Sequence, residues 1–177
     1  MTGKRKIIFG TAFLIAVLVV AYLAFTRLYH PKKPIPIQSL TYGWKYAIPE
    51  EFNHRATKVP KDTEKFIGPT EDGIETNIVI SSAENANGAE WTAMNVVNDP
   101  PEGWKIQLND KYSLEGFEAY TLTATKDSGK WALRQIYLAN NKTVVVMTLV
   151  CSGKTFDQWD PIFLDSLKDF HWLKATK

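Results

Sequence analysis

The chain has 177 residues, 45% of them hydrophobic, and carries 21 Lys and Arg residues against 19 Asp and Glu residues, a net charge of +2. After residue 30 the balance reverses to 17 basic against 19 acidic residues, which removes the electrostatic basis for nucleic-acid binding. The single cysteine, Cys151, excludes an internal disulfide. Because it ends an apolar run, it is interpreted as a small buried residue.

The first predicted element is a transmembrane helix at 7–25, preceded by a basic flank at 1–6. Its 19 residues carry no charge and would extend about 28 Å as a helix, close to the thickness of a bilayer core. A cleaved signal peptide is the alternative, but such peptides have shorter apolar regions that end in small residues, whereas bulky residues follow here from Leu23 to Tyr29. We therefore expect a retained signal anchor that contacts the lipid bilayer.

The basic residues beside this segment predict its orientation. Three of them, Lys4, Arg5 and Lys6, adjoin the span directly, whereas Lys32 and Lys33 stand further beyond its other end. The asymmetry favours a single-pass protein whose C-terminal domain lies on the extracytoplasmic side, periplasmic or extracellular. A linker at 26–37, rich in proline and lysine, leads to one globular domain at 38–173 and a tail at 174–177.

The globular domain is predicted to be rich in strands. Strand-like stretches occupy 39–49, 64–69, 74–83 and 104–108, and a meander follows at 117–125, 131–139 and 143–151. The last of these strands is apolar on both faces, which is typical of a central strand covered above and below.

Two helices are predicted to provide that cover. The first starts at Asn87, where Glu90 would complete a capping box. The second starts either at Thr155, capped with Gln158, or at Asp160, and lies within 155–172. Their apolar faces are Trp91, Met94 and Val97 in the first and Ile162, Phe163, Leu167 and Phe170 in the second. The predicted fold class is α+β: a single antiparallel sheet flanked by helices on both faces, an α/β/α sandwich.

This order of elements resembles the PsbP-like superfamily, which includes the lumenal PsbP subunit of photosystem II and DcrB-like bacterial envelope lipoproteins. The resemblance rests on "YGWKYAIPEEF", "FIGPTEDGIETNIVIS", "GFEAYTLTAT" and the closing "DFHW", and covers 40–172. It implies a sheet between helices and a role in binding proteins or ligands. The chain departs from the family where Phe52 stands at a position usually held by Trp, and where a helix replaces the lipid anchor.

Residues capable of catalysis form no recognised motif. The histidines, His30, His54 and His171, show no metal-ligand spacing, and the serines lack a nucleophile elbow. We therefore expect no catalytic, cofactor-binding or metal-binding residues and no cofactor, and the adjacent acids at 50–51 and 71–72 are interpreted as solvated. Asn141 begins an N-glycosylation sequon. An envelope enzyme with a non-motif site, or a small accessory subunit of a membrane complex, stays as an alternative.

Six tryptophans provide the remaining functional signal, because tryptophan is favoured at the centres of protein interfaces. Trp131 and Trp159 are interpreted as core residues or lids on the sheet. Trp104, which follows the turn "DPPEG", is the candidate for a binding surface. The predicted function is a membrane-anchored, non-catalytic binding or assembly-support domain with a protein partner of unknown identity.

Overall fold

The computed structural model of the chain describes residues 33–84, 87–114, 117–140 and 142–173. The chain divides into two compact units, Met1–Lys33 and Pro34–Lys177. The predicted transmembrane helix at 7–25 lies outside the described residues. Within the described ranges, no helix combines the length and the apolar character needed to cross a membrane.

The second unit contains ten strands, two α-helices and two short 3-10 helices within the described residues. In chain order these are β1 (Ile35–Ser39), β2 (Trp44–Ile48), η1 (Glu50–Phe52), β3 (His54–Arg55), β4 (Thr63–Glu71), β5 (Ile74–Glu84), α2 (Gly88–Asn98), β6 (Trp104–Lys111), β7 (Glu118–Lys126), β8 (Trp131–Ala139), β9 (Thr143–Ser152), α3 (Phe156–Ser166), η2 (Leu167–Asp169) and β10 (His171–Trp172).

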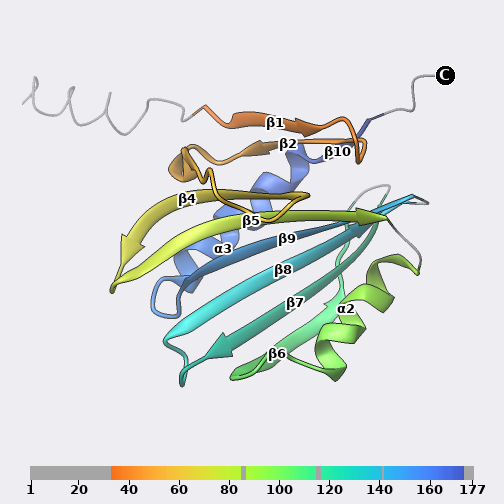
Figure 1. The fold of residues 1–177 in the computed structure, drawn as a ribbon. Coiled ribbons are helices and arrows are strands. Elements are labelled where there is room, and N and C mark those ends of the chain that lie inside the picture. Colours follow the sequence, from red (N-terminus) through yellow and green to blue (C-terminus); the bar gives the residue numbers. More distant parts are fainter. Residues whose placement is uncertain (1–32, 85–86, 115–116, 141, 174–177) are drawn as a thin grey trace, which may run out of the picture. The chain divides into compact units, whose positions relative to one another are not determined.

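The strands form two sheets rather than the single sheet predicted. Seven strands pair in the order β3-β4-β5-β9-β8-β7-β6, every neighbouring pair antiparallel. The opening strands β1 and β2 pair instead with β10 from the end of the chain (Figure 1). β1 begins at Ile35, within the stretch predicted as linker, and includes Pro36. Proline is tolerated there because β1 is an edge strand.

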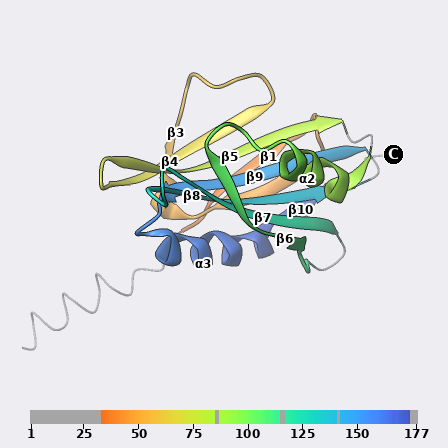
Figure 2. The same ribbon diagram turned by 90° about the horizontal axis from the view of Figure 1, so that it is seen from below.

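The side chains of the central strand β9 contribute to two hydrophobic clusters, one on each face of the large sheet. Val145, Met147 and Leu149 lie in the larger hydrophobic cluster, whereas Val144 and Val146 belong to a second cluster on the other face. This alternation follows from the two-residue period of a strand. The helices α2 and α3 lie on opposite sides of the large sheet (Figure 2), so the antiparallel α+β arrangement is confirmed.

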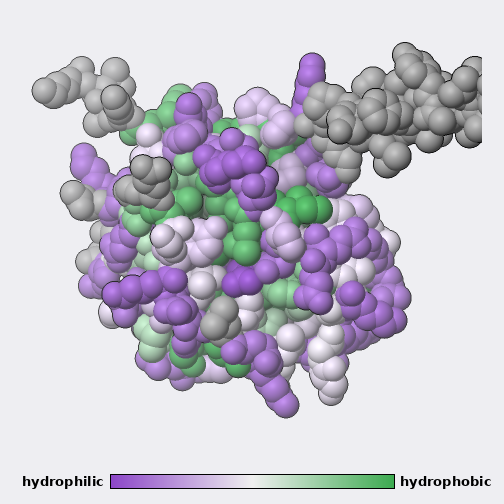
Figure 3. Space-filling view, turned by 180° about the vertical axis from the view of Figure 1, so that it is seen from behind, coloured by the Kyte–Doolittle hydropathy of each residue, from purple (hydrophilic) through white to green (hydrophobic). Residues whose placement is uncertain are grey.

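α3 covers the face that also meets the three-stranded sheet. It begins after Thr155, the first of the two predicted starts, and Pro161 lies inside it. Phe163, Leu167 and Phe170 are buried as predicted, and Trp159 joins them. On the surface of this side, hydrophobic residues form small patches among hydrophilic ones (Figure 3), consistent with a core that is already covered.

A bidentate ion pair also joins α3 to the sheet. Arg134 of β8 donates from Nε and Nη2 to the two carboxylate oxygens of Asp160 at 2.8 and 2.6 Å, and from Nη1 to the hydroxyl of Thr121 at 3.1 Å. The side chains of Arg134 and Asp160 are only 12% and 14% exposed. Solvent therefore screens this pair little.

α2 buries a face that matches the predicted one in part: Met94 and Val97 pack against the cluster beneath the helix, but Trp91 does not. Ala89 and Ala93 are fully buried against Tyr120 and Tyr137, whereas Trp91 is 53% exposed. Small side chains allow the helix to approach the large tyrosine rings, so alanine rather than tryptophan lies against the sheet. Asn87 occupies the N-cap position as predicted, but the carboxylate that caps the helix belongs to Glu118, which accepts the Ala89 N–H at 2.8 Å.

Replacing Gly153 with alanine should be strongly destabilising. A Cβ there would lie 1.8 Å from the carbonyl oxygen of Gly129, because the Gly153 amide bonds to the Lys130 carbonyl at 2.9 Å. We expect Gly153→Ala to lower the free energy of unfolding by about 3 kcal/mol in urea denaturation. Gly73→Ala is the matched control: it has positive φ but open space, and should cost about 1 kcal/mol. Equal losses of unfolding free energy in the two variants would show that the close approach at Gly153 does not contribute to stability.

Arg134→Met should destabilise the domain by about 3 kcal/mol, because it leaves the Asp160 carboxylate desolvated without its partner. The double variant Arg134→Met, Asp160→Leu should recover much of that loss, since both charges are then gone. Urea denaturation of the two single variants and the double variant measures the coupling. Strict additivity of the two single effects would mean that the pair is effectively solvated.

Candidate functional site

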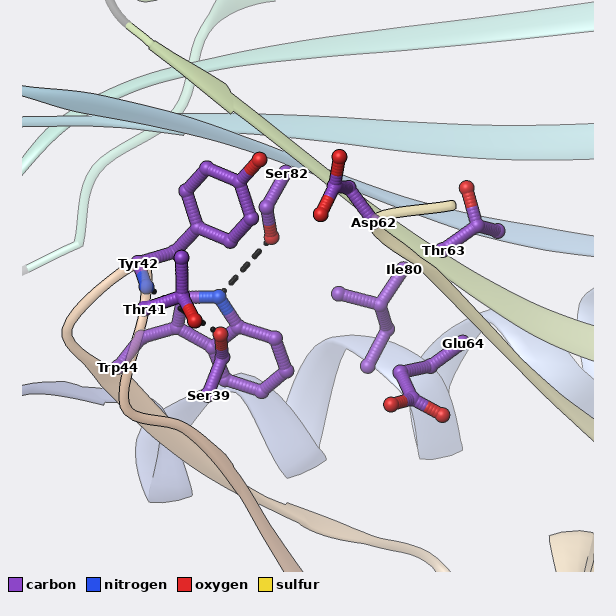
Figure 4. A pocket seen from close by; sticks show the side chains of 9 residues that line it. All are labelled: Ser39, Thr41, Tyr42, Trp44, Asp62, Thr63, Glu64, Ile80 and Ser82. Atoms are coloured by element: carbon purple, nitrogen blue, oxygen red, sulfur yellow. Dashed lines mark hydrogen bonds between the residues drawn. The ribbon is translucent and has the colours of Figure 1, made fainter. Parts of the chain in front are cut away.

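A pocket of about 200 Å³ lies where the β1–β2 turn meets β4 and β5 of the large sheet. We call it the seam pocket. It is lined by Ser39, Thr41, Tyr42, Trp44, Asp62, Thr63, Glu64, Ile80 and Ser82. Figure 4 shows the rings of Tyr42 and Trp44 on one side, the carboxylates of Asp62 and Glu64 on the other, and Ile80 between them.

Trp44 forms the rigid part of this site. Its side chain is 2% exposed, its ring stacks on Phe170 with centroids 6.3 Å apart, and its Nε1 donates to the hydroxyl of Ser82 at 2.9 Å. The hydrogen bond satisfies the indole N–H, as buried tryptophans require. Burial and these two contacts together hold the ring in one orientation.

The turn between β1 and β2 is held by several backbone contacts. Gly43 has φ +69, a conformation natural to glycine, and its N–H bonds to the Ser39 carbonyl at 2.9 Å. The Tyr42 N–H donates to the Ser39 hydroxyl at 3.3 Å, and the Tyr42 carbonyl accepts from the Thr143 hydroxyl at 3.2 Å. These bonds set the backbone position from which the phenol of Tyr42 enters the pocket.

The acidic side of the pocket is positioned by the start of the β4–β5 hairpin. Asp62 has φ +60, and its carbonyl accepts the Ser82 N–H at 3.0 Å. Two residues on, Glu64 accepts two hydrogen bonds from the guanidinium of Arg55, at 2.8 Å from Nε and 2.5 Å from Nη2. Glu64 is therefore neutralised by an internal cation, whereas Asp62 contributes its charge to the pocket.

The negative charge in the pocket affects the pKa of the Tyr42 phenol. Its pKa is raised first by desolvation, then by its hydrogen bond to the Asp62 carboxylate and by the charge of that carboxylate, with a further contribution from the charge of Glu84. A raised pKa means that the surroundings disfavour the phenolate anion. The pocket thus combines hydroxyls, carboxylates and aromatic rings in a field of negative sign, which suits a ligand that donates hydrogen bonds and carries positive charge.

A second hollow, of about 520 Å³, lies on the outer face of the three-stranded sheet. Its lining includes Lys45, Asp169 and His171, with Pro36, Ile37, Gln38, Tyr46 and Ala47. Residues Lys45 and His171 are paired across β2 and β10, so their side chains share this outer face. The hollow carries charges of both signs, unlike the seam pocket.

The tryptophan selected from the sequence does not line either pocket. Trp104 begins β6 and packs, half-buried, against the cluster beneath α2. Its role as a binding surface stays a prediction. Trp159 is buried, as predicted, and donates from Nε1 to Glu71 at 2.9 Å. The large exposed tryptophan is instead Trp91 on α2.

The remaining polar candidates are mostly engaged in structural contacts. Asp72 pairs with Lys154 at 3.2 Å and accepts a long hydrogen bond from Ser152. Cys151 is fully buried, and burial raises the pKa of its thiol to about 12, so the interpretation as a core residue is confirmed. His54 is exposed on β3. Asn141 and His30 lie outside the described residues.

The structure also locates site residues that the sequence did not single out. Ser39, Tyr42, Asp62 and Ser82 are single polar residues at strand ends and turns, and no motif links them. Gly43 is the one sequence signal near them, since glycine is typical of a turn such as the one that carries Tyr42. Among the described residues, no three His, Cys, Asp or Glu side chains are grouped closely enough to hold a metal ion.

Asp62→Asn should lower the pKa of Tyr42, because it removes the carboxylate that opposes the phenolate anion. Desolvation persists in the variant, so the value should remain above that of a free tyrosine. An NMR titration of the Tyr42 ring between about pH 9 and pH 12 measures the change. Asp127→Asn, at another residue with positive φ in the β7–β8 turn, should leave it unchanged. An equal shift in both variants would remove Asp62 as the local cause.

Comparison with known proteins supports the fold. No family model and no curated protein matches the sequence. The cyanobacterial PsbP protein, CyanoP, of Synechocystis sp. PCC 6803 matches the structure with a TM-score of 0.60 and 14% identity, over 81% of this chain and 95% of that one. PA94 of Pseudomonas aeruginosa, a protein of unknown function, gives 0.52 and 16%, over 77% and 94%.

A further structure matches less closely. LpqN of Mycobacterium tuberculosis, a protein involved in cell envelope biogenesis, has a TM-score of 0.49 and 12% identity, over 80% of this chain and 85% of that one. At such identities the matches concern the fold alone. The described part of the chain has the fold of CyanoP, and the resemblance to PsbP-like proteins seen in the sequence is confirmed at that level.

Proposed function

We propose that this chain is a membrane-tethered, non-catalytic binding or assembly-support module on the extracytoplasmic side of the membrane, and that it holds its partner at the seam pocket. The observation that carries the proposal is the pocket itself: about 200 Å³, with the ring of Trp44 fixed by Ser82 and Phe170. Polar groups held by a rigid scaffold bind a ligand without a large ordering cost.

The chemistry of the lining supports holding a ligand rather than transforming it. The nine lining residues supply hydroxyls, two carboxylates and two aromatic rings, and none of the nine is a histidine, cysteine or lysine. The Ser82 hydroxyl accepts the Trp44 indole N–H and so lacks the arrangement of an activated nucleophile beside a base. One observation favours the enzyme alternative: Lys45, Asp169 and His171 line the same hollow.

The sequence supports both the membrane anchor and the extracytoplasmic location of the domain. The apolar run at 7–25 is long enough to span a bilayer core, and the basic residues crowd its N-terminal end. The PsbP-like resemblance points the same way, because that superfamily includes lumenal and envelope proteins. Alkaline carbonate washing should leave the full chain in the membrane, and protease added from outside should digest the domain. Release of an intact chain by the wash would contradict the proposed membrane anchor.

Site-specific photocrosslinking in the full-length protein tests the binding role. A benzoylphenylalanine at Thr41, which is exposed at the edge of the seam pocket, should give a discrete adduct in native membranes. The control is the same residue at Lys130, an exposed position in the β7–β8 turn, which should give none. Adducts of equal yield at both positions, or at neither, would contradict binding through the seam pocket. Adducts formed only from within 7–25 would favour the accessory-subunit alternative.

A further inference from the structure

We infer that the group bound in the seam pocket is an alkylammonium cation, the chemistry shared by a lysine side chain of a protein partner and by a free polyamine. The inference rests on the proposed function and adds the ligand's chemical class to it. It follows from three features of the pocket: the excess of hydrogen-bond acceptors, the sign and location of the charge, and the size and aromatic character of the space.

The polar side chains of the pocket can all accept hydrogen bonds. Ser39, Thr41, Tyr42 and Thr63 contribute hydroxyl oxygens, and Asp62 and Glu64 contribute carboxylates. Two donors among the lining side chains are already used, because the Tyr42 hydroxyl bonds to the Asp62 carboxylate and the Trp44 indole N–H bonds to Ser82. An ammonium group has three donors and no acceptor, so it complements this set, whereas an anion such as phosphate would meet carboxylates.

The location of the charge favours an organic cation. The guanidinium of Arg55 already occupies both oxygens of Glu64, so one wall of the pocket binds such a group through paired N–H···O contacts. The Asp62 carboxylate lies across the pocket near Tyr42 and no ion pair with a described basic residue is seen for it. It therefore offers the anionic partner for a cation that enters from outside.

The dimensions and the walls suit the end of an aliphatic amine. At about 30 Å³ for each water-sized group, a 200 Å³ space holds roughly six such groups, close to the five heavy atoms of a lysine side chain. Ile80 can contact the methylene stem, and the Tyr42 and Trp44 rings line the space where a cation gains from the ring quadrupole.

The inference can be tested by NMR with defined probes. The Trp44 indole N–H and the Tyr42 amide N–H report on the pocket. The chemical shifts of both are followed during titration of the full-length protein in detergent micelles. The probes are n-butylamine, spermidine and Nα-acetyl-lysine methylamide. The controls are n-butanol, which has the stem without the charge, and CaCl₂, which has the charge without the stem.

The ammonium probes should shift both signals in a saturable manner, and Asp62→Asn should weaken the binding about tenfold through loss of a charge-assisted hydrogen bond. Asn tolerates the positive φ of residue 62. Asp127→Asn removes the same charge from a residue with φ +52 at the other end of the strands, and should leave the affinity unchanged. The lysine derivative binding more tightly than spermidine would identify a protein side chain as the source, and the reverse order a polyamine.

Several outcomes would overturn the inference: saturation by n-butanol or CaCl₂ and not by the amines, no response to any amine, or equal weakening in both variants. These outcomes are distinguishable from failure of the proposed function. A Thr41 crosslink without amine binding keeps the binding role and removes the cationic ligand. Amine binding without a Thr41 crosslink keeps the ligand class and removes the protein partner at this pocket.

Discussion

The packing of Trp44 is the contact on which the rest of the arrangement depends. Its backbone belongs to β2 of the small sheet, its indole N–H bonds to Ser82 of β5 in the large sheet, and its ring stacks on Phe170 after α3. One side chain thus ties together three segments that are remote in the sequence. Because it is 2% exposed, these contacts exclude water, which strengthens the hydrogen bond and makes any alternative orientation of the small sheet costly.

The seam pocket is a consequence of this junction. Trp44, Tyr46 and Ile48 of β2 share one core with the large sheet, and the space beside Trp44 is closed by side chains of the neighbouring turns and strands. Here those are the hydroxyls of the β1–β2 turn and the carboxylates at the start of β4. The turn is also tied to the end of the chain, because the Leu173 N–H bonds to the Gly43 carbonyl at 2.8 Å. The seam pocket therefore depends on contacts from both ends of the domain.

Most of the secondary structure could be predicted because its signals are local. The apolar residues on both faces of 143–151 indicated a strand covered above and below, and Val145 and Val144 do lie in separate cores. The start of α3 at Thr155 was one of two options that capping allowed, and burial of Trp159 in its first turns favours the longer helix. The buried face of α2 was predicted only in part. Met94 and Val97 do pack against the cluster beneath the helix, but the residues fully buried against the tyrosines of the sheet are the small Ala89 and Ala93, and the larger Trp91 is exposed.

By itself, the sequence determined the longer strands, the two helices, the burial of Cys151 and the excess of acidic residues after residue 30, because each follows from periodicity or composition over a few neighbouring residues. Only the tertiary structure decided that β1 and β2 leave the main sheet to pair with β10, and that Tyr42 and Asp62 share a pocket. Trp44 and Ser82 are 38 residues apart in the chain, and Trp44 pairs with Trp172 across the small sheet. Contacts over such separations depend on how whole sheets pack, which no local pattern of residues encodes.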